Sequence, residues 1–201
     1  MLNSLSTTQL DNIRLWYVVQ HSLTSFYRLS EYYENLADAV QPDQVETWLK
    51  LGVHKNHLQR LQDFNCKDSQ REFQFCLEQI QKTCDFILLH NEADYPQQLS
   101  HYADKPPIVF GQGKADSLLQ PQVAIVGSRK PSNHGRQMAY DFAYYLSEQG
   151  FYINSGLAQG IDEAAHQGGL KHQRTIAVMG TGLDLTYPAT HQGLRDQILQ
   201  Q

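Results

Sequence analysis

Residues 123–184 decide the fold of this chain, and they have the sequence VAIVGSRKPSNHGRQMAYDFAYYLSEQGFYINSGLAQGIDEAAHQGGLKHQRTIAVMGTGLD. Three short apolar runs lie in this stretch, at residues 123–126, 151–153 and 175–178, and each leads into a turn that contains glycine. Segments with helical periodicity separate the runs. Strands that alternate with helices predict βαβ units, and therefore an α/β fold with a parallel sheet.

The three glycine-containing turns are expected to lie at one edge of that sheet. Right-handed crossovers bring the carboxyl ends of parallel strands to the same edge, and open α/β sheets bind their ligands there. We therefore expect one crevice lined by the turns Gly127–Arg129, Ser155–Asp162 and Gly180–Gly182.

The composition is that of a soluble globular protein. The chain has 201 residues, of which 41% are apolar and 10% aromatic. No apolar run approaches the length of a membrane span, and no signal peptide is recognisable at the N-terminus. Cys66, Cys76 and Cys84 are odd in number and form no C-x-x-C pair. We expect reduced thiols in a cytoplasmic protein.

The acidic charge is unevenly distributed along the chain. The net charge is −5, yet residues 123–201 hold six basic and six acidic residues, so the excess acid lies in residues 1–122. A large basic face is therefore excluded for the glycine-rich segment, whereas a local basic patch is compatible with its charge.

Two domains are expected. Apolar stripes with helical spacing predict four short helices between residues 8 and 64 and a fifth helix before residue 84, which together make residues 1–83 a helical domain. Short apolar runs at 86–89 and 108–110 predict strands. Residues 84–201 are then a Rossmann-like domain, and this domain is expected to be incomplete because a doubly wound sheet normally continues.

The helix expected at residues 134–149 is amphipathic. Met138, Phe142 and Tyr145-Leu146 form one apolar stripe, and Gly150 stands just past the last turn as a stop signal.

The first turn has the residues of an anion site. Gly127 permits a tight turn, while the N–H groups, the Ser128 hydroxyl and the start of the next helix attract negative charge. Arg129 adds a planar guanidinium suited to phosphate. The alternative is an ordinary βα turn with a surface arginine, and the spacing alone leaves both interpretations open.

The second turn has two interpretations as well. Ser155 and the backbone at Gly156 and Gly160 suit a phosphate, with Asp162 holding the shape of the loop. Asp162 also suits the first turn of a helix without any ligand. Asp162 and His166 share a helical face, but a third metal ligand is lacking, so we expect no metal, and a histidine packed under the loop is preferred.

Several common sites are excluded by motif. There is no G-x-G-x-x-G after the first strand, no P-loop and no G-x-S-x-G elbow, and Gly180–Gly182 is a lone G-x-G. Ordinary dinucleotide binding, P-loop nucleotide binding and serine-hydrolase chemistry are therefore not expected, and no cofactor is expected.

The motifs taken together resemble the DNA-processing protein A family, also called DprA or Smf. The resemblance rests on AIVGSRKPS…HG, SGLAQGIDEAAHQGGL and TIAVMGTGLDLTYP, preceded by DYPQQL and DKPPIVFGQG, and it covers roughly residues 84–201. It implies a Rossmann-like domain preceded by a small helical domain similar to the sterile alpha motif (SAM-like). It also implies binding of single-stranded DNA, protection of incoming DNA in natural transformation (competence), and loading of the RecA recombinase. The family is not known as an enzyme family.

The resemblance also implies functional residues. The family motifs map onto Gly127–Arg129, Ser155–Asp162 and Ala165-His166. We expect Asp162 and His166 to shape the loop. The residues expected to bind DNA or phosphate are Gly127, Ser128, Arg129, Lys130, Ser155, Gly156, Gly160, Gly180 and Gly182.

This sequence departs from the family pattern in three places. Gln159 stands where the family often has arginine, and His21–Thr24 replaces a G-x-G turn of the helical domain. The family continues past Gln201 with an F-P-x-R-N-R segment. That later part is implied to supply further DNA contacts and much of the homodimer and RecA surfaces.

The sequence leaves two other hypotheses of function open. The first is a nucleotide-processing enzyme similar to the phosphoribohydrolases, which share a related fold but carry a catalytic glutamate after their glycines, and none follows Gly182 closely. The second is a fragment without function of its own.

Overall fold

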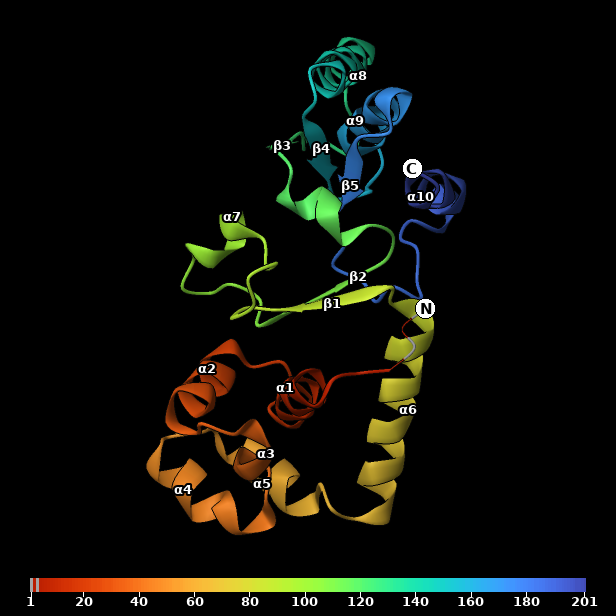
Figure 1. The fold of residues 1–201 in the computed structure, drawn as a ribbon. Coiled ribbons are helices and arrows are strands. Elements are labelled where there is room, and N and C mark those ends of the chain that lie inside the picture. Colours follow the sequence, from red (N-terminus) through yellow and green to blue (C-terminus); the bar gives the residue numbers. More distant parts are fainter. Residues whose placement is uncertain (1, 3) are drawn as a thin grey trace. The chain divides into compact units, whose positions relative to one another are not determined.

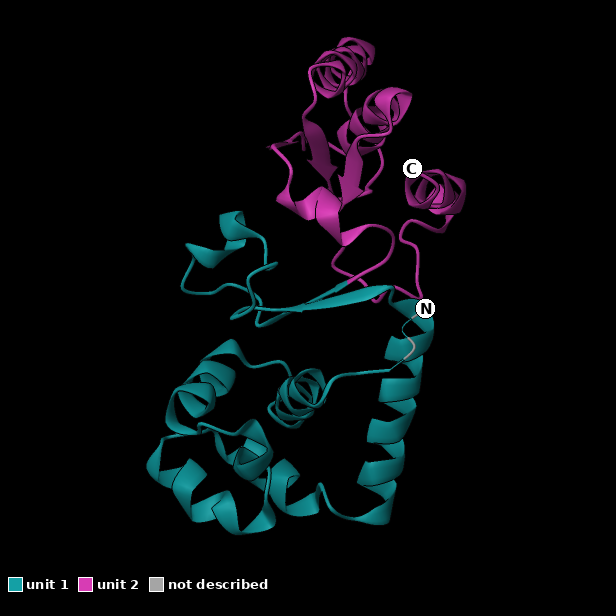
Figure 2. Ribbon diagram, in the orientation of Figure 1, with its two compact units in different colours: residues 1–110 teal, residues 111–201 magenta. Residues whose placement is uncertain are grey.

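The structure is a computed structural model that describes residue 2 and residues 4–201 (Figure 1). The chain forms two compact units, residues 1–110 and 111–201, which Figure 2 distinguishes by colour. The boundary expected after residue 83, between a helical and a Rossmann-like domain, stays a prediction. The mixed α/β fold class is confirmed, because helices connect the strands of a parallel sheet in the second unit.

Helix α1 (Thr7–Val18) opens the first unit with a capping box. The Ser6 hydroxyl accepts a hydrogen bond from the Gln9 N–H, and the Gln9 side chain accepts one from the Ser6 N–H, both at 3.1 Å. Two N–H groups without helical partners are satisfied in this way. The later helices of this unit are α2 (Leu23–Tyr32), α3 (Leu36–Ala39), η1 (Pro42–Gln44, a 3-10 helix), α4 (Val45–Lys50), α5 (Lys55–Asp63), α6 (Lys67–Thr83) and α7 (Gln97–Ser100).

The helices of the first unit enclose an apolar core. Trp48, Phe26 and Leu61 are completely buried, and the Trp48 indole N–H donates to the Ala39 carbonyl at 2.8 Å. Residues 7–63 contain five α-helices instead of the expected four, because the Asn35 side chain caps the single turn α3. The apolar runs predict strands β1 (Phe86–Leu89) and β2 (Ile108–Gly111), and the structure pairs these two strands in a separate two-stranded sheet.

The second unit is built on three parallel strands in the order β3-β4-β5. They are β3 (Gln122–Ala124), β4 (Tyr152–Ser155) and β5 (Thr175–Ala177). Val123 pairs with Ile153, and Ile153 pairs with Thr175. The connecting helices are α8 (Asn133–Glu148) and α9 (Ile161–Gly169), so the predicted β-α-β-α-β arrangement is confirmed.

Short helices complete the second unit. The 3-10 helix η2 (Ala115–Leu119) precedes β3, and η3 (Leu170–His172) joins α9 to β5. After β5 the chain forms η4 (Ala189–His191) and α10 (Gln192–Leu199).

Helices α8 and α9 lie next to each other, as Figure 1 shows, and their contact uses very small residues. A Cβ atom added at Gly168 of α9 would lie 2.5 Å from the Tyr140 carbonyl oxygen and 2.8 Å from the Ala143 Cβ. Ala143 and Ala165 form the core together with Ile153 of β4. The two helix backbones are therefore too close for any large side chain between them.

The apolar stripe predicted on α8 is mostly exposed, and of its four residues only Leu146 packs partly against the core. Met138, Phe142 and Tyr145 are exposed, whereas Ala139 and Ala143 are buried. The close approach of α9 explains the difference, because it selects the face with small residues and turns the large ones outward.

Two general features follow from the described residues. None of their helices is both long enough and apolar enough to cross a membrane. Cys66, Cys76 and Cys84 are all free thiols.

Candidate nucleic-acid interface

The structure brings the three glycine-containing turns together at the carboxyl edge of the sheet. The turn after β3 contacts the turn after β4, because the Ile161 N–H donates to the Ser128 carbonyl at 3.2 Å. The turn after β4 approaches the end of β5, where a Cβ added at Gly156 would lie 3.8 Å from the Val178 carbonyl oxygen. The shared edge predicted from the sequence is therefore formed.

The turn after β3 is open to solvent. Gly127, Ser128, Arg129 and Lys130 are all exposed. The Ser128 hydroxyl accepts a hydrogen bond from the Lys130 N–H at 3.0 Å, which fixes the bend of the turn. Neither Arg129 nor Lys130 makes a side-chain hydrogen bond or salt bridge within the described residues, so both cations are available to a ligand.

Close packing against α9, as well as backbone flexibility, requires glycine at position 127. A Cβ there would lie 2.9 Å from the Ile161 Cγ1 of α9. The start of α8 is capped by Ser132, whose hydroxyl accepts from the Gly135 N–H at 3.1 Å. This internal cap uses one of the helix N–H groups that the sequence interpretation offers to an anion.

The turn after β4 is held by interactions within the protein. Asp162 is 6% exposed, and its Oδ2 accepts from the Gly156 N–H at 3.1 Å and from the Ala158 N–H at 3.4 Å. Gly160 has φ 91°, and a Cβ there would lie 2.3 Å from the Ser128 carbonyl oxygen. The backbone of this turn therefore depends on one carboxylate and one glycine.

Ser155 differs from its expected role as a phosphate-binding residue. Its side chain is buried, and its hydroxyl donates to the Ile125 carbonyl at 2.7 Å. The hydroxyl thus ties β4 to the end of β3 and is not presented at the surface. The sequence interpretation missed this because the acceptor lies 30 residues away.

His166 lies beneath the turn in a fully buried position. Its Nδ1 lies 2.7 Å from the Thr175 Oγ1, and the Thr175 hydroxyl donates to the Ile153 carbonyl at 2.8 Å. Both hydrogen bonds form together when His166 Nδ1 carries the proton. Burial lowers the pKa of His166 to about 4, with a smaller lowering by His191, against the opposing effects of the Asp162 charge and the Ser155 carbonyl. His166 is therefore neutral at pH 7.

His191 of η4 holds the same turn from its other side. This residue is 7% exposed, and its Nδ1 donates to the Leu157 carbonyl at 2.8 Å. Its Nε2 lies 3.9 Å from the Glu163 Oε2, which also accepts from Arg136 at 3.0 Å. No sequence pattern pointed to this role, because the acceptor at Leu157 lies 34 residues away in the chain.

The turn after β5 is exposed and loosely packed. No atom lies within 4 Å of a Cβ added at Gly180, so that glycine is not required by packing. Arg195 of α10 supports the segment that follows: it donates to Thr186 Oγ1 at 2.9 Å, to Gln112 Oε1 at 2.6 Å and to the Leu183 carbonyl. Arg195 is 9% exposed and was not expected from the sequence, where it resembles a surface residue of an amphipathic helix.

Three other cations of the second unit are not available beside the open turn. Arg136 is paired with Glu163 at 3.0 Å. Arg174 precedes β5 and donates to the Ser147 carbonyl, and Lys171 lies in η3, so both belong to the amino end of β5. Lys171 and Arg174 therefore lie away from the glycine turns, at the opposite end of β5.

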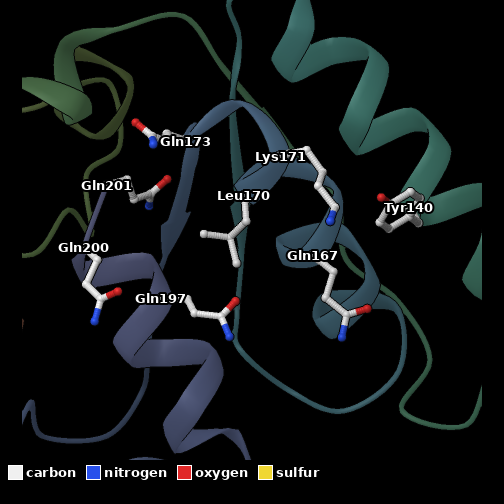
Figure 3. Close-up of a pocket in the computed structure, with 8 residues that line it drawn as sticks. All are labelled: Tyr140, Gln167, Leu170, Lys171, Gln173, Gln197, Gln200 and Gln201. Atoms are coloured by element: carbon white, nitrogen blue, oxygen red, sulfur yellow. The ribbon is translucent and has the colours of Figure 1, made fainter.

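An open pocket of about 510 Å³ lies at this amino end of β5 (Figure 3). Tyr140, Leu170 and Lys171 line it together with five glutamines, Gln167, Gln173, Gln197, Gln200 and Gln201. The Gln201 side chain already pairs with the Thr175 N–H at 3.2 Å and the Thr175 carbonyl at 2.6 Å. None of the expected DNA-binding residues lines this pocket.

No group of three or more His, Cys, Asp or Glu side chains within the described residues is arranged to hold a metal ion.

The geometry defines an α/β protein with glycine-rich turns and two free cations at the carboxyl edge of a parallel sheet. Comparison with known proteins identifies its family. Residues 86–201 match the family described as DNA recombination-mediator protein A. This match covers more than half of the chain, which therefore belongs to that family, as its resemblance to DprA and Smf predicts.

Individual relatives agree with this assignment. Protein Smf of Synechocystis sp. is 35% identical over 176 residues, covering 85% of this chain and 44% of the relative. The DNA processing protein DprA of Streptococcus pneumoniae is 42% identical over 122 residues, covering 60% of this chain and 42% of the relative. The chain thus spans less than half the length of these curated relatives.

A solved structure shows the same fold over almost the whole chain. The X-ray structure of DprA from Streptococcus pneumoniae matches with a TM-score of 0.74 and 29% identity. The match covers 98% of this chain and 65% of that chain.

Proposed function

We propose that this chain binds single-stranded DNA at the carboxyl edge of its parallel sheet. The observation that carries the proposal is the open turn after β3, where Arg129 and Lys130 are exposed and unpaired beside Gly127 and Ser128. Single-stranded DNA offers phosphates to such cations and flexible bases to the glycine turns. Membership of a recombination-mediator family supports a nucleic-acid ligand.

The residues of the edge divide into two groups under this proposal. The contact group is exposed and comprises Gly127, Ser128, Arg129, Lys130, Gly180 and Gly182. The shaping group is held by internal contacts and comprises Gly156, Gly160, Asp162 and His166. We leave Ser155 out of the contact group because its hydroxyl is already used within the sheet.

Binding at this edge is proposed to be weak and strongly dependent on salt. The segment from residue 123 has no excess of basic residues, so few phosphates are neutralised. For a single strand, the slope of log K against log salt is about −0.7 for each phosphate contact. Two contacts, at Arg129 and Lys130, therefore correspond to a slope of about −1.4.

The wider role that we propose is the one that the family resemblance implies. The protein would act in the cytoplasm during natural transformation, protect incoming single-stranded DNA and help to load RecA. A homodimer and the RecA contact are proposed for the longer family architecture, because the resemblance assigns much of those surfaces to its later part.

Binding without catalysis is the function that we propose for the edge. The Asp162 carboxylate accepts two backbone N–H groups, and the Glu163 carboxylate is paired with Arg136. Both acidic groups in the first turn of α9 are thus engaged in structural contacts, and no observation favours the phosphoribohydrolase alternative.

The test compares two lysine variants for binding of fluorescent oligo-dT at several salt concentrations. Lys130→Ala should weaken binding and flatten the salt slope by about 0.7, because one phosphate contact is lost. Lys171→Ala is the matched control, since Lys171 is an exposed lysine of the same unit at the opposite end of β5. Equal effects of the two substitutions, or no binding by the unmodified chain at low salt, would refute the site.

A second pair of variants tests Arg129. Arg129→Ala should weaken oligo-dT binding by about 1–3 kcal/mol, because a charge-assisted hydrogen bond is lost. Arg129→Lys should recover only part of that loss, since lysine cannot form the two parallel hydrogen bonds of a guanidinium. Full recovery of oligo-dT affinity in Arg129→Lys would show that Arg129 contributes only its positive charge.

A further inference from the structure

The pocket at the amino end of β5 has a lining that the proposed DNA site does not use. Its volume of about 510 Å³ lies within the range of about 300–1,000 Å³ that small-molecule sites occupy. Among the described residues, the lining offers one ammonium group, one phenol, one leucine and five carboxamides, and no carboxylate. Open α/β sheets usually bind ligands at their carboxyl edge, so this pocket is separate from the edge proposed for DNA.

Gln201 shows how a carboxamide of this wall engages a partner. Its Oε1 accepts from the Thr175 N–H at 3.2 Å, and its Nε2 donates to the Thr175 carbonyl at 2.6 Å. An adjacent donor and acceptor therefore fix this side chain. The edge of an adenine base presents the same pair of groups, and glutamine binds it with two hydrogen bonds.

The other four carboxamides of the pocket have no such partner. Exposed glutamines are usually solvated, so a single one would indicate no ligand. Here four of them surround one hollow and offer several donors and acceptors in a small volume. All four are exposed, and their side chains make no hydrogen bond with another described residue: Gln167, Gln173, Gln197 and Gln200.

Gln173 stands where the backbone favours glycine. It follows η3 with φ 57° and ψ 40°, in the left-handed region. Glutamine is uncommon in this conformation, because its Cβ lies too close to the following carbonyl oxygen. Packing does not explain the side chain, since it is exposed and unpaired within the described residues. Its place in the pocket wall supplies a reason for a carboxamide at this position.

Lys171 gives the pocket a single positive charge. Its side chain is exposed and forms no salt bridge within the part of the chain that the structure describes. Figure 3 shows Lys171 and Tyr140 on one side of Leu170, with Gln200 and Gln201 on the other. One ammonium group suits one phosphate, while the leucine side chain and the tyrosine ring offer apolar surface to a flat base.

We propose that this pocket binds a purine nucleoside monophosphate. The phosphate lies at Lys171, the base lies against Leu170, and the carboxamides of Gln173 and of α10 bind the base edge. A free mononucleotide and the 5′-phosphorylated end of a strand present this same chemistry. The proposal does not depend on DNA binding at the carboxyl edge of the sheet.

Calorimetric titration of the chain with deoxyadenosine monophosphate (dAMP) tests the ligand. Deoxyadenosine and deoxyribose 5-phosphate should each bind at least about tenfold more weakly than dAMP, because each lacks one of the two groups that the pocket contacts. The triphosphate dATP should bind no more tightly than dAMP, since the pocket has a single cation.

Gln173→Gly separates ligand binding from backbone strain. The variant should lower the dAMP affinity about fivefold or more, as expected for lost hydrogen bonds to a base edge. Its melting temperature should be unchanged or higher, because glycine accepts the left-handed conformation. Gln20→Gly is the matched control, since Gln20 is an exposed glutamine with φ 49° in the first unit. This control should leave the dAMP affinity unchanged.

Lys171→Ala tests the phosphate contact. The dAMP affinity should fall about tenfold, whereas the weaker binding of deoxyadenosine should not change. Comparing oligo-dA that carries a 5′-phosphate with oligo-dA that carries a 5′-hydroxyl identifies the source of the nucleotide. Tighter binding of the phosphorylated strand that Lys171→Ala abolishes would assign the pocket to a strand end. Oligo-dT with hydroxyl ends lacks this phosphate, so Lys171→Ala remains the control for the DNA edge.

Two results would overturn the proposal. One is the absence of dAMP binding by the folded, unmodified chain. The other is dAMP binding that Lys130→Ala weakens but Gln173→Gly and Lys171→Ala do not, which would place the nucleotide at the carboxyl edge. The proposed DNA site is judged separately by oligo-dT binding, so an empty pocket would leave that site intact.

Discussion

The turns after β3 and β4 both contain glycine, but their side chains make different contacts. In the turn after β3, Arg129 and Lys130 are exposed and unpaired. In the turn after β4, Asp162 accepts two backbone N–H groups, and His191 donates to the Leu157 carbonyl. Internal hydrogen bonds therefore fix the turn after β4, whereas the turn after β3 packs against it and keeps its cations exposed to solvent. Glycine content alone does not distinguish a ligand-binding turn from a structural one.

The largest effect is expected at Gly160. Gly160→Ala should lower the free energy of unfolding by about 4 kcal/mol or more, since an alanine there combines positive φ with a severe steric clash. The added Cβ would lie 2.3 Å from the Ser128 carbonyl oxygen at φ 91°. Urea denaturation measures the loss.

Gly180→Ala is the control for that prediction, because nothing lies within 4 Å of its added Cβ. Its stability should change by no more than about 0.5 kcal/mol. A similar loss in both variants would show that the turns after β4 and β5 are equally constrained.

His166 should make the stability of the second unit depend on pH. Its pKa is lowered to about 4 by burial, whereas an unfolded chain binds this proton near the usual value of 6.5. Protons therefore favour unfolding, and the stability present above pH 6.5 is lost as the pH falls toward 4. The loss is about 3.5 kcal/mol at most, from the free energy of about 1.4 kcal/mol for each pKa unit.

The measurement is urea unfolding of the chain and of His166→Gln between pH 7 and pH 4. The variant is expected to be less stable at pH 7 but to lose less stability on acidification. Parallel curves for the two proteins would mean that His166 does not titrate in this range.

Asp162→Ala should have a smaller effect on stability at neutral pH. The N–H groups of Gly156 and Ala158 would lose their acceptor, at a cost of about 2–3 kcal/mol. Asp184→Ala, which removes an exposed carboxylate of the turn region, should cost about 0.5 kcal/mol or less. Oligo-dT affinity measured on folded Asp162→Ala then shows whether the open turn needs its support.

The smallest effect on stability is expected at Arg129. Arg129→Ala should change the melting temperature very little, because an exposed side chain without partners contributes less than about 0.5 kcal/mol. The same sample should show the loss of oligo-dT affinity predicted above. A large drop in melting temperature with unchanged affinity would make the turn after β3 structural, like its neighbour.

The sequence by itself was enough to predict the parallel β-α-β-α-β arrangement and the shared edge of the three turns. Apolar runs, helical periodicity and glycine positions are local signals, and the handedness of crossovers converts them into a topology. The family resemblance of residues 84–201 was also visible in the order of the motifs. Gly127, Gly156 and Gly180 accordingly follow the three strands at one edge.

Only the tertiary structure decided which residues of that edge are free. The Ser155 hydroxyl donates its hydrogen bond to the Ile125 carbonyl. Arg195, which lies in the later helix α10, donates to the Leu183 carbonyl. It also decided which face of α8 is buried, since hydrophobicity favoured Met138 and Phe142 whereas close packing against Gly168 required Ala139 and Ala143. Sequence periodicity records which residues share a face, but the neighbouring element determines which face can be buried, because its backbone sets the space available.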